Sequence, residues 1–242
     1  MRNKKVTAIV LAAGKGSRMR SDVPKQYLEI DGKPILYYSL CTFEQSSVDD
    51  IVLVTRPEDV EYCRNDVVGK YRLSKVSCVV AGGEERYWSV WNGLQACART
   101  DYVLIHDAAR PCITVENVEE AISGVIKWGA CTLGVPVKDT IKQVDDDNYG
   151  VATPVRKYLW QIQTPQSFSH DQLVDAYKRM IQDKVTDVTD DTMIVERYLN
   201  LKTKVIQGDY RNLKVTTPED LDLVKIFLKK MKKVVDIGVM RC

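Results

Sequence analysis

VTAIVLAAGKGSRM, residues 6–19, places an apolar run directly before a turn that holds two glycines, a lysine and an arginine. The run Val6–Leu11 is short and β-branched, a pattern that predicts a buried strand. Small residues after such a strand let backbone N–H groups come close to a phosphate or to the edge of a base. The stretch therefore predicts a strand that ends at a turn which approaches a phosphate, with Gly14 and Gly16 in that turn.

Two familiar phosphate-binding motifs fail on this turn. The fingerprint G-x-G-x-x-G needs a glycine where the chain has Met19, and the P-loop motif needs a glycine at Ile9 and a hydroxyl at Gly16. What remains is a glycine turn followed by Arg18, with Lys25 a few residues further on. These cations can meet the negative charge of a phosphoryl transition state, but a plain strand–turn–helix connection with surface cations is the alternative.

Strand and helix patterns alternate along the first half of the chain. The predicted strands are Val6–Leu11, Ile51–Thr55, Val76–Val80 and Val103–His106. The predicted helices are Pro34–Phe43, Arg86–Ala98 and a third from the cap Thr114 to a stop at Gly129. The alternation predicts an α/β fold with a Rossmann-like, mostly parallel sheet, helices on both of its faces, and ligands at the carboxyl ends of its strands.

The segment 137–163 interrupts this alternation, because two β-like runs flank a polar turn at Asp145–Asn148. An isolated two-stranded hairpin is marginal in water, so the segment must lean on a domain of its own or on a second subunit. We expect a single domain, 1–242, with 137–163 as a protruding arm.

The chain after the arm returns to helices and a strand. The sequence predicts a helix capped by Ser169 with Gln172 as its capping-box partner, a helix starting near Thr189, a strand Lys204–Gln207, and a final helix with Thr217 as cap and Pro218 as first residue.

Composition narrows the class of protein. With a net charge of only +2, the 242-residue chain lacks the excess of positive charge that is typical of proteins that bind nucleic acids or membrane surfaces. No segment approaches the roughly 20 apolar residues of a membrane span. The seven cysteines include no C-x-x-C pair, so we expect neither a zinc site nor a disulfide framework, and reduced thiols in a cytoplasmic protein.

The stretch His106-Asp107-Ala108-Ala109-Arg110-Pro111 ends the fourth predicted strand. A carboxylate there is well placed to hold Mg²⁺ together with phosphate oxygens, although a turn cap is the plainer reading of Asp107. Arg110 is either a phosphate clamp or a surface arginine. His106 is expected to be a packed histidine, because a phosphate nucleophile is already ionised and needs no base. The acidic pairs and triplets at Asp190–Asp191 and Asp145–Asp147 are expected to be a helix start and a turn.

The ordered set of motifs resembles one family, the 2-C-methyl-D-erythritol 4-phosphate cytidylyltransferases. The similarity extends over residues 6–228, and the motifs that carry it are AAGKGSRM (12–19), PKQY (24–27), GGEER (82–86), SVWNGL (89–94), HDAARP (106–111), PVKDTIK (136–142), QTPQSF (163–168), TDD (189–191) and NLKVTTPEDL (212–221). It implies the nucleotide-diphospho-sugar transferase type of the fold, CTP and methylerythritol phosphate as partners, Mg²⁺ or another divalent cation as cofactor, and a homodimer formed through the arm.

The resemblance also implies a role for individual residues. The expected catalytic residues are Arg18, Lys25, Arg156 and Lys214; the expected nucleotide-binding residues are Ala12, Ala13, Gly14, Gly16, Gly83 and Ser89; the expected substrate-binding residues are Arg110, Thr140, Arg156 and Lys214; the expected metal ligand is Asp107. In the family, Thr140 and Arg156 sit on an arm that reaches the neighbouring subunit.

Two other functions stay open on the sequence. Ribitol-5-phosphate cytidylyltransferases usually read GGTGTRM and HDSVRPF where this chain has AAGKGSRM and HDAARP, which favours the isoprenoid-pathway family. A non-catalytic nucleotide-sensing module would not need Arg18, Lys25, Asp107 and Lys214 together. The chain departs from the family at the bulky Tyr87-Trp88 and in the tail after Lys233.

Overall fold

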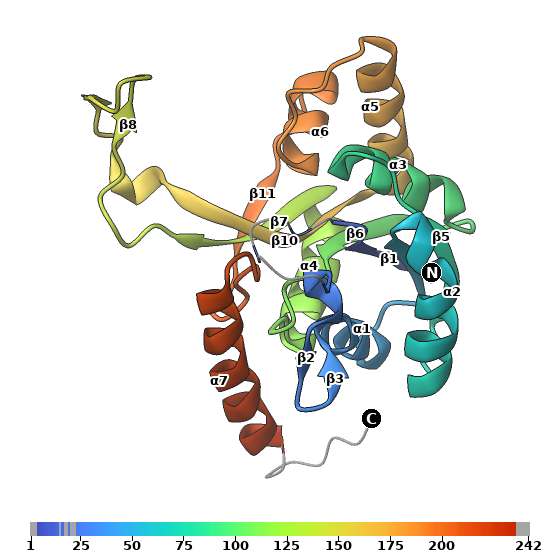
Figure 1. Ribbon diagram of the computed structural model, residues 1–242. Coiled ribbons are helices and arrows are strands. Elements are labelled where there is room, and N and C mark those ends of the chain that lie inside the picture. Colours follow the sequence, from blue (N-terminus) through green and yellow to red (C-terminus); the bar gives the residue numbers. More distant parts are fainter. Residues whose placement is uncertain (1–3, 15, 17–18, 20–22, 236–242) are drawn as a thin grey trace.

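The computed structural model describes residues 4–14, 16, 19 and 23–235 of the chain. Its centre is a seven-stranded sheet in the order β11-β7-β10-β6-β1-β4-β5 (Figure 1). The strands of this sheet are β1 Val6–Ala12, β4 Asp50–Thr55, β5 Val76–Ala81, β6 Tyr102–Asp107, β7 Ala130–Pro136, β10 Trp160–Ser169 and β11 Lys204–Gln207. The longer helices are α1 Ile35–Gln45, α3 Arg86–Ala96, α4 Val115–Trp128, α5 His170–Gln182, α6 Asp191–Leu199 and α7 Pro218–Val235.

The predicted α/β fold with a mostly parallel sheet is confirmed. All seven residues of β1 are buried, and β1 pairs in parallel with β4 on one side and β6 on the other. Strand β10 lies between β6 and β7 and runs antiparallel to both. The sheet is therefore mixed, with one reversed strand among those described.

Helices cover both faces of the sheet because alternate side chains of β1 point to opposite sides. Ala8 and Val10 belong to a core shared with α1 and α4, whereas Ile9 and Leu11 belong to a core shared with α3, α5 and α6. Because one of these two apolar cores covers each face of the sheet, the central strands are buried on both faces.

A third apolar cluster fastens the C-terminal helix to the rest of the domain. Val224 and Leu228 of α7 pack with Tyr38 of α1, with Met19 and with Val215. The short strands β2 (Glu29–Ile30) and β3 (Lys33–Pro34) form a hairpin at the same place. Met19 is thus held between α1 and α7.

The segment between β7 and β10 forms an arm that projects from the body (Figure 1). Its tip is the hairpin of β8 (Gln143–Val144) and β9 (Gly150–Ala152), followed by a short turn of helix, η5, at Arg156–Tyr158. The backbone N–H groups of Asp147 and Tyr149 both donate to the Asp145 carboxylate, so the acidic run is a turn, as predicted. The second β-like run differs from the expectation, because Trp160–Ser169 continues from the arm into the central sheet.

Helix ends confirm some of the expected caps and correct others. Thr114 accepts a hydrogen bond from the Asn117 N–H, and Gly129 ends that helix at φ 79°. Ser169 precedes α5 but its side chain makes no cap bond, so the predicted capping box with Gln172 is wrong. The reason is that Ser169 still pairs with Tyr102 in the sheet.

Two helix starts after α5 can be compared with their predictions. Helix α6 begins at Asp191 rather than near Thr189, with the Asp190 carboxylate accepting from the Met193 N–H. The final helix begins at Pro218, as predicted, and the Asp220 carboxylate accepts from the N–H groups of Thr216 and Thr217.

One helical segment has no counterpart in the sequence analysis. The chain after β4 winds through η3 (Pro57–Asp59), α2 (Val60–Tyr62) and the wider turns of η4 (Cys63–Gly69), and it buries Cys63 and Val67 in the core. Within the described residues, no helix is long and apolar enough to cross a membrane. Free thiols are found at Cys63, Cys78, Cys97, Cys112 and Cys131, as expected, but Cys41 is disulfide-bonded, so the expectation of reduced thiols is wrong at that position.

Candidate active site

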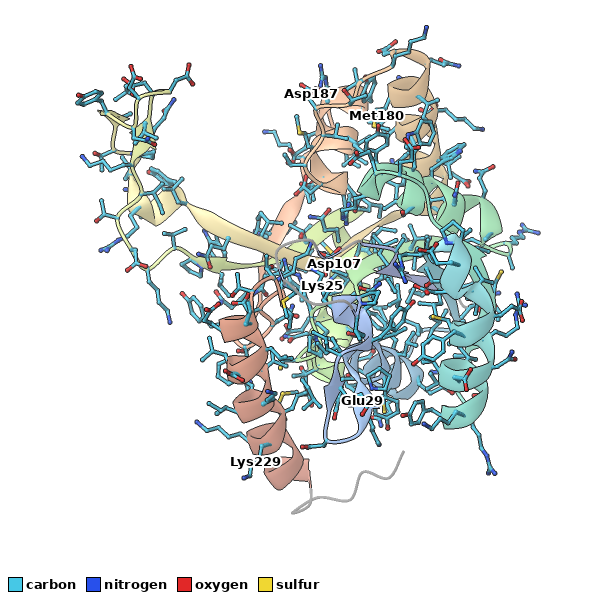
Figure 2. The ribbon with its side chains drawn as sticks, viewed as in Figure 1. Lys25, Glu29, Asp107, Met180, Asp187 and Lys229 are labelled. Carbon is cyan, nitrogen blue, oxygen red and sulfur yellow. The ribbon has the colours of Figure 1, made fainter. Side chains whose placement is uncertain are left out.

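A pocket of about 550 Å³ opens at the carboxyl ends of β1, β4, β5 and β6. Its lining comes from four loops that follow these strands and from the segment before α7: Leu11, Ala12, Ala13, Gly14, Lys25, Gln26, Arg56, Pro57, Glu58, Gly82, Gly83, Glu84, Glu85, Arg86, Ser89, Asp107, Ala109 and Lys214. Figure 2 labels two of these residues, Lys25 and Asp107, near the middle of the molecule. The sheet edge that the sequence predicted for ligands is therefore the edge that is hollowed.

The glycine turn after β1 forms one wall. Ala12, Ala13 and Gly14 line the pocket, and a side chain at Gly14 would point into open space. Gly16 has φ +66°, and a Cβ there would lie 3.3 Å from Lys25 Cγ, so both conformation and space favour glycine. The amide of buried Gln26 donates to the Ala12 carbonyl over 2.7 Å, which ties the turn to the PKQY motif.

Lys25 lies beside this wall, where its ammonium donates to the Val215 carbonyl over 2.9 Å. Arg18, the other expected transition-state cation, lies outside the described residues. The short helical turn η2 (Lys25–Tyr27) therefore brings Lys25 to the pocket. A hydrogen bond to the backbone of the segment before α7 holds its ammonium group there.

The loop after β5 forms the opposite wall. Ser89 Oγ accepts from the Gly83 N–H over 3.1 Å, so the two predicted nucleotide-binding residues of this loop are in contact. A Cβ at Gly82 would come within 2.6 Å of both Ala13 Cβ and Ser89 Oγ, which brings the two glycine loops together. A Cβ at Gly83 would overlap the Cβ of Trp88.

The bulky pair at 87–88 does not intrude. The rings of Tyr87 and Trp88 lie 5.4 Å apart and tilted, and neither residue belongs to the lining given above. Tyr87 packs against the core that α3 shares with α5. The departure from the family pattern therefore leaves the described walls of the pocket intact.

Asp107, at the end of β6, is surrounded by three cations. Its carboxylate lies 2.9 Å from Lys214 Nζ, 3.4 Å from Arg86 Nε and 3.7 Å from Arg110 Nε. Burial by itself would raise the pKa of Asp107, but the charges of Arg86, Lys214 and Arg110 outweigh it and lower the pKa well below its usual range. The group is therefore an anion at any physiological pH.

Lys214 and Arg110 approach Asp107 from different depths. Lys214 lines the pocket with 38% of its side chain exposed, whereas only 12% of the Arg110 side chain is exposed. Arg110 donates to the Asn212 carbonyl over 2.8 Å, and burial lowers its pKa. Arg110 thus lies behind Asp107, while Lys214 faces the open side.

His106 is buried next to Asp107 and packs edge-on to Phe43. Its Nδ1 lies 3.0 Å from Thr164 Oγ1. Desolvation lowers the pKa of His106 to about 3, so the imidazole is neutral. The expectation of a packed histidine is confirmed.

Sequence reasoning missed the way in which Arg86 joins Asp107 to Asp191. Arg86 donates through Nη2 to the fully buried Asp191 carboxylate over 2.8 Å, and Tyr177 donates its hydroxyl to the same carboxylate over 2.6 Å. Asp191 had been assigned only to a helix start. The signal was present in the GGEER and TDD motifs, but nothing in the sequence shows that their side chains pair.

The arm residues lie apart from this cluster. Arg156 donates to the Lys138 carbonyl over 2.9 Å within the arm, and both Arg156 and Thr140 are exposed. The arm extends away from the pocket-bearing edge (Figure 1). A single chain therefore unites Lys25, Asp107 and Lys214 and leaves Thr140 and Arg156 outside.

Together these contacts describe a site suited to a polyphosphate. Three cations converge on the Asp107 carboxylate, and the small residues Ala13 and Gly14 let a ligand approach the backbone of the first wall. On the second wall the N–H groups of Gly82 and Gly83 already donate to Thr55 and Ser89. The described carboxylates do not make a closed metal site, because no group of three or more His, Cys, Asp or Glu side chains occurs among the described residues. Asp107 suits a divalent cation only as one ligand beside phosphate oxygens.

Comparison with known proteins finds one family. The model of the family described as IspD, 2-C-methyl-D-erythritol 4-phosphate cytidylyltransferase, matches residues 6–230. The protein of that name from Lachnospira eligens is 51% identical over 225 residues, covering 92% of this chain and 99% of its own. The one from Caldanaerobacter subterraneus is 44% identical over 227 residues, covering 93% and 99%.

Solved structures give the same result. The crystal structure of the 4-diphosphocytidyl-2C-methyl-D-erythritol synthase from Anaerococcus prevotii has a TM-score of 0.82 at 34% identity and covers 93% of this chain and 96% of its own. The 2-C-methyl-D-erythritol 4-phosphate cytidylyltransferase from Thermus thermophilus has a TM-score of 0.75 at 25% identity, covering 91% and 98%.

Proposed function

The chain belongs to the 2-C-methyl-D-erythritol 4-phosphate cytidylyltransferase family, and from this premise we propose the chemistry of its pocket. The protein transfers the cytidylyl group of CTP to methylerythritol phosphate and forms 4-diphosphocytidyl-2-C-methyl-D-erythritol and pyrophosphate. The observation that carries the proposal is the convergence of Lys214, Arg86 and Arg110 on Asp107 beside two glycine loops.

The reaction needs no side-chain base. A phosphate oxygen of methylerythritol phosphate attacks the α-phosphorus of CTP, a P–O bond forms, and the bond to the β-phosphate oxygen breaks with release of pyrophosphate. The nucleophile is already ionised, and His106, neutral and buried, is not available to take a proton. Lys25 and Lys214 stabilise the added negative charge, and Arg18 is proposed to act with them.

The nucleotide is proposed to bind between the two glycine walls. Ala12, Ala13 and Gly14 form one wall and Gly83 with Ser89 forms the other, and these small residues let a flat base or a phosphate come close to the backbone; Gly16, expected to bind the nucleotide as well, lies outside the lining. Lys214, on the open side of Asp107, is proposed to receive the phosphate of the second substrate, and Arg110, buried behind Asp107 and outside the lining, is proposed to act on that phosphate only through its charge.

We propose that Asp107 would contribute one oxygen ligand to a divalent cation such as Mg²⁺, which would otherwise be held by phosphate oxygens. Such an ion neutralises phosphate charge and orients the leaving group. In support, Asp107 is anionic and lines the pocket.

The arm is proposed to complete the site of a second subunit in a homodimer. Its large apolar side chains are open to solvent: Tyr149 and Tyr158 are each 73% exposed, Val155 is 60% exposed and Val151 is 58% exposed. A second copy of the chain would cover them and would bring Thr140 and Arg156 to the other subunit's Lys214. A cytoplasmic location is part of the proposal; the free thiols of Cys63, Cys112 and Cys131 support it, whereas the disulfide-bonded Cys41 does not.

One assay separates the candidates. Pyrophosphate release from CTP is measured with methylerythritol phosphate and with ribitol 5-phosphate in parallel. Turnover with the first substrate alone supports the proposal, turnover with the second indicates a polyol-phosphate enzyme, and CTP binding without turnover indicates a sensing module.

A further inference from the structure

The segment 208–215, which links β11 to α7, touches both the root of the arm and the pocket. On the arm side, the Tyr210 hydroxyl donates to the Pro136 carbonyl over 2.7 Å. Lys138, two residues into the arm, places its ammonium 3.6 Å from the centre of the Tyr210 ring. One aromatic residue therefore holds the outgoing strand of the arm by two contacts at its root.

The middle of this segment is a rigid turn. The Asp209 carboxylate accepts from the backbone N–H of Arg211 over 2.7 Å and from its guanidinium Nε over 2.9 Å, and these bonds lower the pKa of Asp209. The Gln163 amide donates to the Asp209 carbonyl over 2.8 Å, which fixes the turn to the returning strand β10. The turn thus contacts both strands that bear the arm.

The other end of the segment holds the pocket's lysines. Lys214 pairs with Asp107, and the Val215 carbonyl receives the ammonium of Lys25 over 2.9 Å. The Val215 N–H in turn donates to the Ala109 carbonyl over 2.8 Å. Only three residues lie between Tyr210, which contacts the arm, and Lys214, which lines the pocket, so the position of one contact is tied to that of the other.

We propose that Tyr210 is a positioning residue for the reaction, which sets the direction of the arm relative to the pocket. The proposal rests on the proposed function, because it requires that Arg156 of the arm binds the substrate phosphate in a neighbouring subunit. Tyr210 itself is 41% exposed and lies outside the pocket lining, so we assign it no contact with a substrate. Its contacts with Pro136 and Lys138 fix the direction in which the arm leaves the sheet.

Steady-state kinetics of two Tyr210 variants and one control test this role. Tyr210→Phe loses the bond to Pro136 and keeps the ring under Lys138, so KM for methylerythritol phosphate should rise by about 2- to 10-fold, the scale of one neutral hydrogen bond. Tyr210→Leu loses both contacts and should raise it by roughly tenfold or more. KM for CTP should not change. Tyr62→Phe, a control at 42% exposure on α2, should leave both values unchanged.

A double variant gives the decisive result. If Tyr210 acts only through Arg156, then Tyr210→Leu combined with Arg156→Ala should be no worse for methylerythritol phosphate than Arg156→Ala alone. Additive losses, or an unchanged KM for methylerythritol phosphate in Tyr210→Leu, overturn the positioning role.

The failure of the underlying proposal has a different signature. An Arg156→Ala variant with unchanged KM for methylerythritol phosphate overturns the arm's part in the site, whatever Tyr210 does. Sedimentation of each variant accompanies the kinetics. If the Tyr210 variants change their oligomeric state in step with KM, Tyr210 supports assembly rather than direction, and the inference fails.

Discussion

Replacing Asp107 by asparagine removes the negative charge on which three cations converge and keeps the size of the side chain. Lys214, Arg86 and Arg110 would then face one another without a common anion. Removing one partner of a buried ion pair costs about 3–5 kcal/mol of unfolding free energy. The lower end of this range is expected, because Lys214 is 38% exposed and can turn to water, whereas Arg110, 12% exposed, cannot.

The pH dependence of the loss follows from the direction of the pKa shift. Asp107 has a lower pKa in the folded protein than in the unfolded chain, so it contributes stability above its unfolded pKa and loses it as the pH falls through the folded value. The difference in unfolding free energy between wild type and Asp107→Asn should be constant from pH 5 to pH 8 and should shrink progressively once the pH falls below the unfolded pKa of 3.8.

Urea unfolding measures the loss, with the m-value as a check on two-state behaviour. In thermal unfolding the same loss corresponds to a fall of roughly 6–20 °C in Tm for a chain of this size. Asp175→Asn is the matched control, because it breaks a surface pair with Arg179 at 2.8 Å and should cost less than about 1 kcal/mol. If Asp107→Asn costs no more than this control at an unchanged m-value, the electrostatic reasoning about the site is wrong.

The remaining predictions concern catalysis, metal, acid stability and assembly. Lys25→Ala and Arg18→Ala should each lower kcat by roughly 10²–10³ and weaken equilibrium CTP binding far less; a near-normal kcat in either variant contradicts the assigned role. Asp107→Asn should need more Mg²⁺ for half-maximal activity, and an unchanged Mg²⁺ titration would remove Asp107 from the ligands. Desolvation lowers the pKa of His106 from 6.5 to about 3 in the folded protein. Between pH 6.5 and pH 3 the unfolded chain therefore binds a proton at His106 that the folded protein does not, so the free energy of unfolding should decrease as the pH is lowered through this range. The unfolding free energy of His106→Gln, measured with urea from pH 4 to pH 7, should decrease less steeply with falling pH than that of the wild type. Equal slopes would refute the lowered pKa of His106. Arg156→Lys should raise KM for methylerythritol phosphate and spare CTP, because a lysine lacks the two-pronged planar donor. Mixed Arg156→Ala and Lys25→Ala chains should regain part of the activity if subunits share sites; exchange of subunits without recovery would exclude sharing.

The sequence predicted the outline of this protein because its strongest signals are local. Val6–Leu11 is apolar enough to be a buried strand in almost any setting, and Gly129 ends a helix by its own backbone freedom. The strand reversal at β10 was not predicted, since Trp160–Ser169 has the composition of a buried strand whichever way it runs. Its direction is fixed only by pairing with residues 105 and 132, which are distant in the chain.

The candidate site divides in the same way. Asp107 and Lys25 belong to motifs whose residue types indicate a phosphate-binding site, and both residues line the same pocket in the structure. The pairing of Arg86 with Asp191 spans 105 positions, and no pattern within either motif specifies it. Arg110 was expected to meet solvent or substrate, yet the packing of Asn212 over it leaves little of it exposed. Such outcomes depend on tertiary packing, which periodicity does not report.

The single reversed strand has a geometric consequence for what this sheet can carry. Strand β7 ends at Pro136, opposite Trp160, the first residue of β10. Since β10 runs against its neighbours, any length of chain inserted between the two leaves and re-enters the sheet at the edge where β6 ends in Asp107. A parallel strand in the same place would have forced the insertion to return at the far edge, on the other side of the domain from Asp107. Because one strand is reversed, the inserted segment can be longer or shorter without any change in the order or direction of the core strands. A new domain attached to this protein would therefore be inserted between residues 136 and 160.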